Sequence, residues 1–268
     1  MRSTVRVSIA ACVAFLMLLT ACATVPITGR RQLSLMSQAE LVGMAASDYE
    51  QFVSESTVSG DDEARGRVAD VGGRVSLATS EFLRENGMEY ELSLYDWEFQ
   101  LIEDEAANAF CMPGGKIVVF TGLLPIAETD AGLAVVVAHE VAHAIANHSG
   151  ERMSQLLLAQ LGGMALSKAI EEKPKETKDL AMLAYGIGSQ VAVLLPYSRR
   201  HESEADRIGL VLMAKAGYDP RAALEFWQRM AAQSEGQPPE FLSTHPAHST
   251  RIEDIRTHMP EALAAYRG

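Results

Sequence analysis

The chain has 268 residues, 48% of them hydrophobic, which is enough for one domain with a sizeable core. Its formal net charge of −12 disfavours nucleic acid as a partner, because an acidic surface repels phosphate groups. Three cysteines and the absence of sequence repeats also exclude a fold held together by disulfides and a repeat protein.

Residues 1–21 have the pattern of an export signal. Arg2 and Arg6 give it a positive start, and Val7–Leu19 form its apolar stretch. The tetrapeptide LTAC that ends at Cys22 resembles a bacterial lipoprotein box, in which Cys22 becomes the acylated first residue of the mature chain. The alternative is an ordinary signal peptide that is cleaved at the motif ACA, which would give a soluble product.

Cleavage before Cys22 removes Arg2 and Arg6 and no acidic residue, so the net charge of the mature chain is −14. Such a chain gains little from anionic lipid headgroups, and we expect membrane attachment through the acyl chains on Cys22. Ala23, where an Asp could stand, indicates sorting to the outer membrane. Cys111 then remains as the one unmodified thiol, and we interpret it as a small hydrophobic side chain.

The first half of the mature chain predicts two helices and a small sheet. Apolar spacing favours helices, and alternation of apolar and polar residues favours strands. In chain order the predicted elements are helices at Ser37–Val58 and Asp61–Asn86, strands at Met88–Trp97 and Leu101–Glu105, and a hairpin at Ala109–Phe120 that turns at Pro113-Gly114-Gly115. Gly87 is expected to cap the end of the second helix.

From residue 130 onward the chain is predicted to be helical, with Thr129 or Asp130 as the N-terminal cap. The later helices are expected at Arg152–Ile170, Leu180–Leu195, Arg200–Lys215 and Pro220–Gln233, and from about Ser249. The apolar stretches Met153–Ser167 and Leu180–Ser198 are interrupted by glycines, so we predict buried helices beside the one that begins near residue 130, not membrane spans. The fold class is therefore α+β, mostly helical with a small β-sheet.

The apolar run Ala131–Ala146 contains the motif HEVAH, in which His139 and His143 are four residues apart. On an α-helix these positions share one face, so both imidazoles can approach one zinc ion at about 2.0–2.1 Å. Glu140 then lies where it can take a proton from a bound water. The motif can arise by chance with hydrogen-bonded core histidines, but polar groups in so apolar a helix need partners, and a metal supplies one.

A third ligand is expected because a catalytic zinc usually has three protein ligands and one open position. Glu202 and Asp206 are again four residues apart, so Glu202 can bind the ion while Asp206 accepts a hydrogen bond from a ligand imidazole. The other interpretation of this charged segment is a solvated helix face. His201 and Glu204 are rival ligands, although His201 points in a different direction from Glu202 because the two are adjacent.

The motifs recur in an order that is typical of a known family. They are Asn108-Ala109-Phe110, Pro113-Gly114-Gly115, Thr121-Gly122, HEVAH at 139–143, ExxxD from Glu202 to Asp206, and Ser243-Thr244-His245-Pro246 followed by Arg251. Together they span about residues 27–256. The chain thereby resembles the gluzincin metallopeptidases that include HtpX, the type-one CAAX prenyl proteases, mitochondrial Oma-type proteases and the envelope proteases BepA and LoiP.

The resemblance implies one Zn²⁺ per chain, bound by His139, His143 and Glu202, with Glu140 as general base and acid and Asp206 orienting a ligand. It also implies that Asn108 faces the substrate at the edge of the cleft. His245 would lie near the zinc, with Arg251 nearby, either stabilising the oxyanion or acting as an extra ligand that gates the metal. A turn residue is the plain alternative for His245. His148, His248 and His258 are interpreted as surface or capping residues.

The function that the resemblance implies is zinc-dependent endopeptidase activity in the bacterial cell envelope, on unfolded or misassembled envelope proteins. A chaperone or assembly factor for outer-membrane proteins, with little or no proteolysis, is the alternative, and the intact Glu140 favours cleavage. We expect a signal peptide at 1–21, a lipidated tether at 22–36 and a zinc metallopeptidase domain at 37–268. The expected location is the periplasmic face of the outer membrane, with the soluble periplasm as the alternative.

Overall fold

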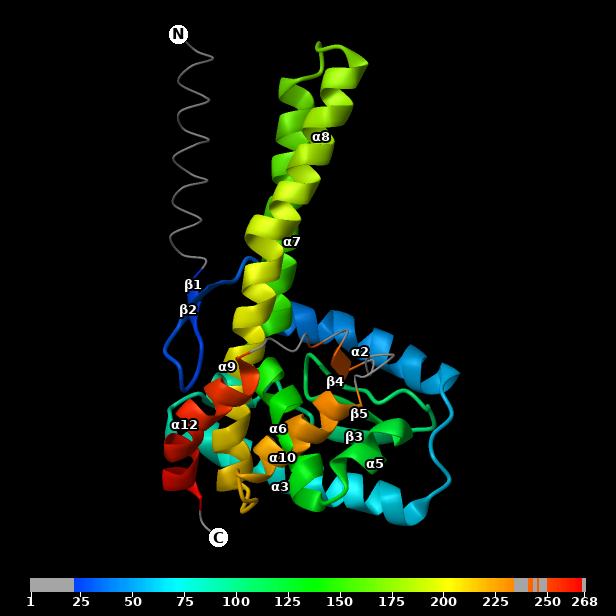
Figure 1. Cartoon of the computed structure of the whole chain (residues 1–268), viewed down its shortest axis with the longest axis vertical. Coiled ribbons are helices and arrows are strands. Elements are labelled where there is room, and N and C mark those ends of the chain that lie inside the picture. The colour runs from blue at the N-terminus through cyan, green and yellow to red at the C-terminus, as the bar shows by residue number, and fades with distance from the viewer. Residues whose placement is uncertain (1–21, 234–240, 243–244, 246–249, 267–268) are drawn as a thin grey trace. The chain divides into compact units, whose positions relative to one another are not determined.

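The computed structural model describes residues 22–233, 241–242, 245 and 250–266 (Figure 1). The predicted signal peptide, most of the segment around His245, and Ser249 lie outside the described residues. The chain divides into two compact units, one formed by the residues up to 37 with 150–194, the other by 38–149 with the residues from 195 onward. The described residues form mostly helices and two small sheets, so the predicted α+β class is confirmed. The functional boundaries at 21 and 36 stay a prediction.

The larger unit contains a three-stranded sheet in the order β3 (Glu98–Ile102), β5 (Lys116–Phe120), β4 (Ala109–Met112). β5 pairs parallel with β3 and antiparallel with β4, and the β4–β5 hairpin turns where the sequence predicts it. Gly114 and Gly115 have φ angles of 93° and 86° in this turn, a conformation that glycine adopts without strain.

The described part of the larger unit also contains several helices. They are α2 (Gln38–Glu55), α3 (Asp62–Glu85), α4 (Glu89–Leu92), η1 (Thr121–Leu123), α5 (Leu124–Ala127), α6 (Asp130–Ile145), α9 (Leu195–Lys215), α10 (Ala222–Ala232) and α12 (Arg251–Ala265). Of these, α2, α3 and α6 contact the sheet. α3 ends as predicted: Gly87 has a φ of 70°, and the N–H of Met88 donates to the carbonyl of Leu83.

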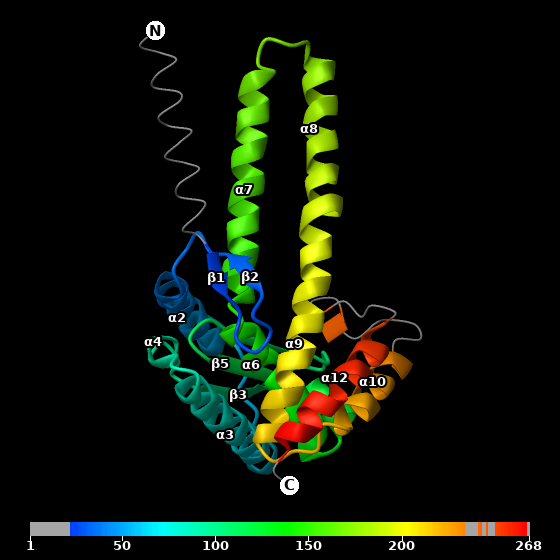
Figure 2. The ribbon, with the colours of Figure 1, turned by 90° about the vertical axis from the view of Figure 1, so that its left-hand side faces the viewer.

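Helix α6 is at the centre of the larger unit, in contact with α3, α9, α10 and β4 (Figures 1 and 2). Its residues from Gly132 to Ala142 are buried without a break. Thr129 is the N-cap, because its side chain accepts a hydrogen bond of 3.1 Å from the N–H of Gly132. The HEVAH motif is thus carried by a helix that is held on several sides.

The prediction of a strand at Met88–Trp97 was wrong. Glu89–Leu92 form the short helix α4, and β3 begins only at Glu98. The alternation of apolar residues does not reflect one buried face, since Tyr90 is 64% exposed. A strand needs a hydrogen-bonded neighbour, and β5 pairs with β3 only over residues 98–102.

The smaller unit combines a two-stranded sheet with a helical hairpin. β1 (Cys22–Thr24) pairs antiparallel with β2 (Arg31–Leu33), and α7 (His148–Ala169) runs beside α8 (Lys175–Ser189) in both ribbon views (Figures 1 and 2). A π-helix, η2 (Gln190–Leu194), follows α8. Within this unit, Arg30 connects the two-stranded sheet to α7 through a bidentate ion pair with the buried Glu151, with distances of 3.0 and 2.7 Å.

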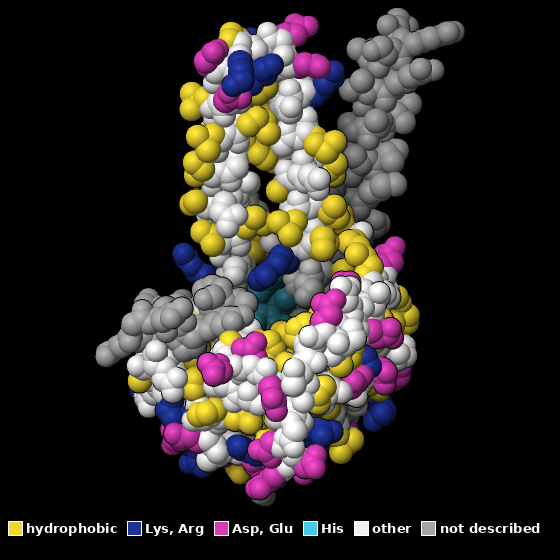
Figure 3. Space-filling model, turned by 90° about the vertical axis from the view of Figure 1, so that its right-hand side faces the viewer, with side chains coloured by type: hydrophobic (Ala, Val, Ile, Leu, Met, Phe, Trp, Pro, Cys, Tyr) yellow, Lys and Arg dark blue, Asp and Glu magenta, His cyan; other side chains and the backbone are white. Residues whose placement is uncertain are grey.

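The prediction that residues 153–167 and 180–198 form buried helices was also wrong for the hairpin. Its two arms contact each other along a narrow stripe, where Tyr185 packs on Gly162 and Gly163 and donates to the carbonyl of Ala159. The outward sides remain open, and Figure 3 shows their hydrophobic side chains along both arms. The exposed ones are Met153, Leu156, Leu158, Leu161, Met164, Leu180, Met182, Leu183, Ile187 and Val191. Within the described residues, no helix has both the length and the hydropathy that a membrane crossing requires.

Candidate metal centre

The site forms where α6 crosses α9. Gly209 of α9 lies directly against α6, since a Cβ atom at this position would be 3.1 Å from the backbone nitrogen of His139. This close approach brings the Glu202 side of α9 against the histidines of HEVAH. Both helices are buried here, with Glu202 0% and His139 2% exposed.

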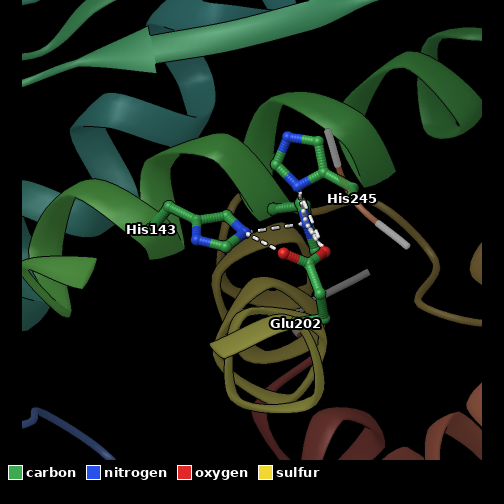
Figure 4. A group of neighbouring side chains, drawn as sticks. His143, Glu202 and His245 are labelled. Carbon is green, nitrogen blue, oxygen red and sulfur yellow. Dashed lines mark hydrogen bonds and ion pairs between the residues drawn. The ribbon is translucent and has the colours of Figure 1, made fainter. Parts of the chain in front are cut away.

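Four side chains bring possible ligand atoms together: His139, His143, Glu202 and His245. Figure 4 labels three of them, and shows His143, Glu202 and His245 converging on one point. The Nε2 atoms of His139 and His143 are 3.0 Å apart, and Nδ1 of His245 is 3.3 Å from Nε2 of His139. The carboxylate of Glu202 closes the group, with Oε2 3.1 Å from His245 Nδ1 and Oε1 3.6 Å from His143 Nε2. All four donor atoms lie within 4.8 Å of one another.

These distances suit a tetrahedral zinc ion. Ligand atoms about 2.0–2.1 Å from a tetrahedral centre are about 3.3–3.4 Å from one another. Here the donor atoms of His139 and His143, His139 and His245, His245 and Glu202, and His143 and Glu202 are 3.0, 3.3, 3.1 and 3.6 Å apart, and the whole group lies within 4.8 Å. Two carboxylate oxygens near the cluster, Oε1 of Glu140 and Oε1 of Glu202, are buried and accept no hydrogen bond from the described residues. A cation would compensate the cost of burying them. The residues therefore fit the metal that the sequence implies.

The electrostatics of the cluster are those of a cation site. Burial would lower the pKa of His139, but its hydrogen bonds with Asp206 and Glu202 raise it to about 9. Burial would raise the pKa of Glu202, but the imidazoles of His143, His139 and His245 hold it well below its usual range. In the absence of a metal, a proton on His139 thus supplies positive charge that the carboxylates attract.

Glu140 is 2% exposed, and burial raises the pKa of its carboxyl group. Nε2 of His245 is 3.4 Å from Oε1 of Glu140, and the backbone of Cys111 donates a hydrogen bond to the carboxylate. A carboxylate with a raised pKa at the edge of a metal-type cluster is suited to accept a proton and release it again.

A second layer of charged groups supports His139. Oδ1 of Asp206 is 3.0 Å from Nδ1 of His139 and accepts a 2.7 Å hydrogen bond from Nη2 of Arg251. The guanidinium of Arg251 lies 3.4 Å from the ring centre of Trp227. Because Asp206 occupies Nδ1, Nε2 of His139 is the nitrogen that is directed at the cluster and that can bind a metal once its proton is lost.

The structure places two further predicted residues outside the cluster. Asn108 is buried at the start of β4, and its Oδ1 accepts a hydrogen bond from the N–H of Ala109. Cys111 lies half-buried in β4, and burial raises the pKa of its thiol well above the usual value, as suits a side chain that packs and does not react. His245 is held differently: its ring stacks on that of Phe241 with 4.5 Å between centres, and its backbone N–H donates to the backbone carbonyl of Phe241.

One buried residue was misassigned from the sequence. His148, interpreted as a surface or capping residue, is 3% exposed, and its Nδ1 lies 2.8 Å from Nδ1 of His143. Glu204, the rival ligand, contacts Nε2 of His148 at 3.1 Å instead of joining the cluster. The signal in the sequence is Asn147, a residue type that tolerates a positive φ; it has a φ of 52° after α6 ends, and α7 begins at the next residue, His148.

Comparison with known proteins agrees with the expected resemblance. The mitochondrial metalloendopeptidase OMA1 of Schizosaccharomyces pombe is 36% identical over 247 residues, which cover 89% of this chain and 66% of that protein. The human metalloendopeptidase OMA1, mitochondrial, is 34% identical over 246 residues, which cover 89% of this chain and 46% of that protein. The beta-barrel assembly-enhancing protease of Yersinia pestis is 31% identical over 164 residues, covering 60% and 34% respectively.

The chain thus spans about half to two thirds of the length of the OMA1 proteins of human and Schizosaccharomyces pombe. A family model described as Peptidase family M48 matches residues 74–259, more than half of the chain. That range contains the HEVAH motif of α6, Glu202 and His245. The chain therefore belongs to peptidase family M48.

Proposed function

We propose that this chain is a zinc-dependent endopeptidase of the bacterial cell envelope, and that it cleaves unfolded or misassembled envelope proteins. The observation that carries the proposal is the convergence of His139, His143 and Glu202 next to the buried carboxylate of Glu140. This donor set is the His₂Glu set of catalytic zinc sites, one zinc per chain, and the matched relatives are metalloendopeptidases.

A zinc ion held by His139, His143 and Glu202 would supply the Lewis acid that polarises the scissile carbonyl and lowers the pKa of a water molecule toward about 7. Glu140 accepts the proton of that water and passes it to the amine nitrogen of the leaving segment. Asp206 and Arg251 keep His139 in one orientation during the reaction.

His245 is proposed to gate this site. Its Nδ1 belongs to the cluster of donor atoms, so with a metal bound it would occupy the position that a substrate and water need. Four protein donors complete a tetrahedron, whereas a catalytic zinc keeps one position open. Stabilisation of the oxyanion by the same histidine is the alternative, and it would require the ring to leave the cluster.

The proposed location is the periplasmic face of the outer membrane, with the chain anchored through acyl groups on Cys22. The support is the lipoprotein-type sequence around Cys22, together with the similarity to the beta-barrel assembly-enhancing protease of a bacterium. Asn108 is proposed to face the substrate from the start of β4. The alternative is an assembly factor for outer-membrane proteins with little or no proteolysis. The words "beta-barrel assembly-enhancing" in the name of the Yersinia relative support it, but the intact Glu140 favours cleavage.

Glu140→Gln tests the proposal. The variant should bind one zinc per chain and fold as the wild type does, yet lose proteolysis of denatured casein by a factor on the order of 100 or more, because the proton acceptor is gone. Undiminished turnover would rule out the mechanism. Envelope proteins that accumulate on the inactive variant in cells, identified by mass spectrometry, would then report the substrate class.

A further inference from the structure

A series of buried side chains in contact with one another leads from the ligand His143, through His148, to the carboxylate of Glu204. Nδ1 of His143 faces Nδ1 of His148 at 2.8 Å, and Nε2 of His148 faces Oε2 of Glu204 at 3.1 Å. His148 comes from the first turn of α7, and Glu204 lies on α9 two residues after Glu202. The side chains of His148 and Glu204 are 4% and 5% exposed.

We propose that His148 and Glu204 are positioning residues, which fix the tautomer and orientation of His143 for metal binding. The inference rests on the proposed zinc site and concerns two residues that neither bind the ion nor touch the substrate. His143 would act as a ligand through Nε2, and the chain from Nδ1 through His148 to Glu204 would hold its ring.

The tautomers follow from the two distances. Glu204 is a carboxylate and accepts, so the nitrogen that faces it, Nε2 of His148, carries a hydrogen. In a neutral imidazole the other nitrogen has a lone pair, so Nδ1 of His148 accepts a hydrogen bond from Nδ1–H of His143. Nε2 of His143 then has its lone pair toward Nε2 of His139 and the carboxylate of Glu202, as a metal ligand must.

The opposite tautomer of His143 would prevent metal binding. A hydrogen on Nε2 of His143 would point into the cluster and exclude a cation from it. The chain through His148 prevents this, as Asp206 does for His139 from the other side of the cluster. His201 adds rigidity, because its ring stacks on that of His148 with 4.3 Å between centres and an angle of 14°. Each ligand histidine therefore has its own carboxylate support.

The test measures zinc affinity in the mature chain by competition with a chelator, which requires no proteolysis. His148→Phe keeps an aromatic ring but removes both hydrogen bonds, and the zinc dissociation constant should rise by about 10–100-fold. His148→Asn retains an acceptor close to the place of Nδ1 and should recover part of that loss. The control is His258→Phe. His258 lies on α12 and does not belong to the series His143–His148–Glu204, so the zinc dissociation constant should be unchanged.

Glu204→Gln keeps the shape of the carboxylate and removes its charge. It should weaken zinc binding by less than His148→Phe, whereas Glu261→Gln, which alters a carboxylate paired with Arg207, should have no effect. A dissociation constant within twofold of wild type for a folded His148→Phe variant would overturn the proposal. The same conclusion would follow if His148→Asn were as weak as His148→Phe.

Nitrogen-15 NMR of the imidazoles separates this proposal from the proposed function. If His148 and Glu204 position His143, the metal-free protein must have a hydrogen on Nδ1 of His143 and none on Nε2. This holds even if the wild type binds no zinc. Finding the Nε2–H tautomer would refute it. The same spectrum decides the matter if His148→Phe fails to fold, because it is recorded on the wild type.

Discussion

A Cβ atom on Gly209 would lie 3.1 Å from the backbone nitrogen of His139 and 3.2 Å from the carbonyl group of Ala138. Both neighbours are backbone atoms of α6, which cannot rotate aside as a side chain can. Glycine at this position therefore sets how closely α9 approaches α6, and with it the separation of Glu202 from the two histidines.

Gly209→Ala should push the two helices apart. We expect a loss of about 1–3 kcal/mol in the free energy of unfolding, as for other overpacked cores, together with weaker zinc binding. Urea unfolding and chelator competition would measure the two effects. Gly73→Ala in α3 is the matched control, since no atom lies within 4 Å of the added Cβ, and there alanine should be neutral or stabilising by up to about 1 kcal/mol. Equal behaviour of the two variants would contradict the role of Gly209.

This contact shows what the sequence could and could not predict. Spacing of four residues placed His139 with His143, and Glu202 with Asp206, each pair on one helix face. The sequence does not show that α6 and α9 cross at Gly209, because that depends on packing between segments about 60 residues apart. The relation of His148 to Glu204 was missed for the same reason.

Composition was also a weak guide to burial in the helical hairpin. The uncharged stretches that start at Met153 and Leu180 read as buried helices, yet Leu161 and Leu183 are 58% and 61% exposed. Hydropathy shows that a segment is apolar. It does not show whether other residues of the same chain bury that segment.

Zinc binding should depend on pH through His139. The hydrogen bonds with Asp206 and Glu202 raise its pKa to about 9 in the metal-free protein, so between pH 6.5 and 9 the zinc must displace a proton. Zinc affinity should therefore rise with pH, by up to about tenfold per unit, and level off above pH 9. Chelator competition at several pH values, with calorimetry in two buffers to count released protons, measures this. A pH-independent affinity from 6.5 to 9 would show that His139 is neutral before the metal binds.

The raised pKa of His139 also makes the free energy of unfolding depend on pH. A histidine whose pKa is higher in the folded than in the unfolded chain stabilises the fold fully below pH 6.5, and this contribution is lost as the pH rises through about 9. In metal-free protein, Asp206→Asn should reduce that pH dependence, because the first hydrogen bond that raises the pKa is weakened. Urea unfolding at pH 6.5 and pH 9 in a chelator would compare the two proteins. An unchanged pH slope in Asp206→Asn would assign the dependence to another group.

Anchoring is tested at Cys22. With an acyl chain there, the protein should fractionate with membranes, and its N-terminal peptide should carry lipid by mass spectrometry. Cys22→Ser should release the protein or block its processing, whereas Cys111→Ser should leave fractionation unchanged. A mature N-terminus at Thr24 without lipid would establish the soluble alternative instead.

The role of His245 can be decided by the sign of one effect. If its Nδ1 gates the zinc, as its distances of 3.1 Å to Glu202 and 3.3 Å to His139 support, His245→Ala should raise the rate of casein cleavage and expose the metal to chelators. A tenfold rise would correspond to about 1.4 kcal/mol of lost resting-state coordination. If the ring instead stabilises the oxyanion, the substitution should lower kcat by about 100–1000-fold with little change in KM. His258→Ala serves as the control, and an unchanged rate in His245→Ala would leave this histidine with a structural role, stacked on Phe241.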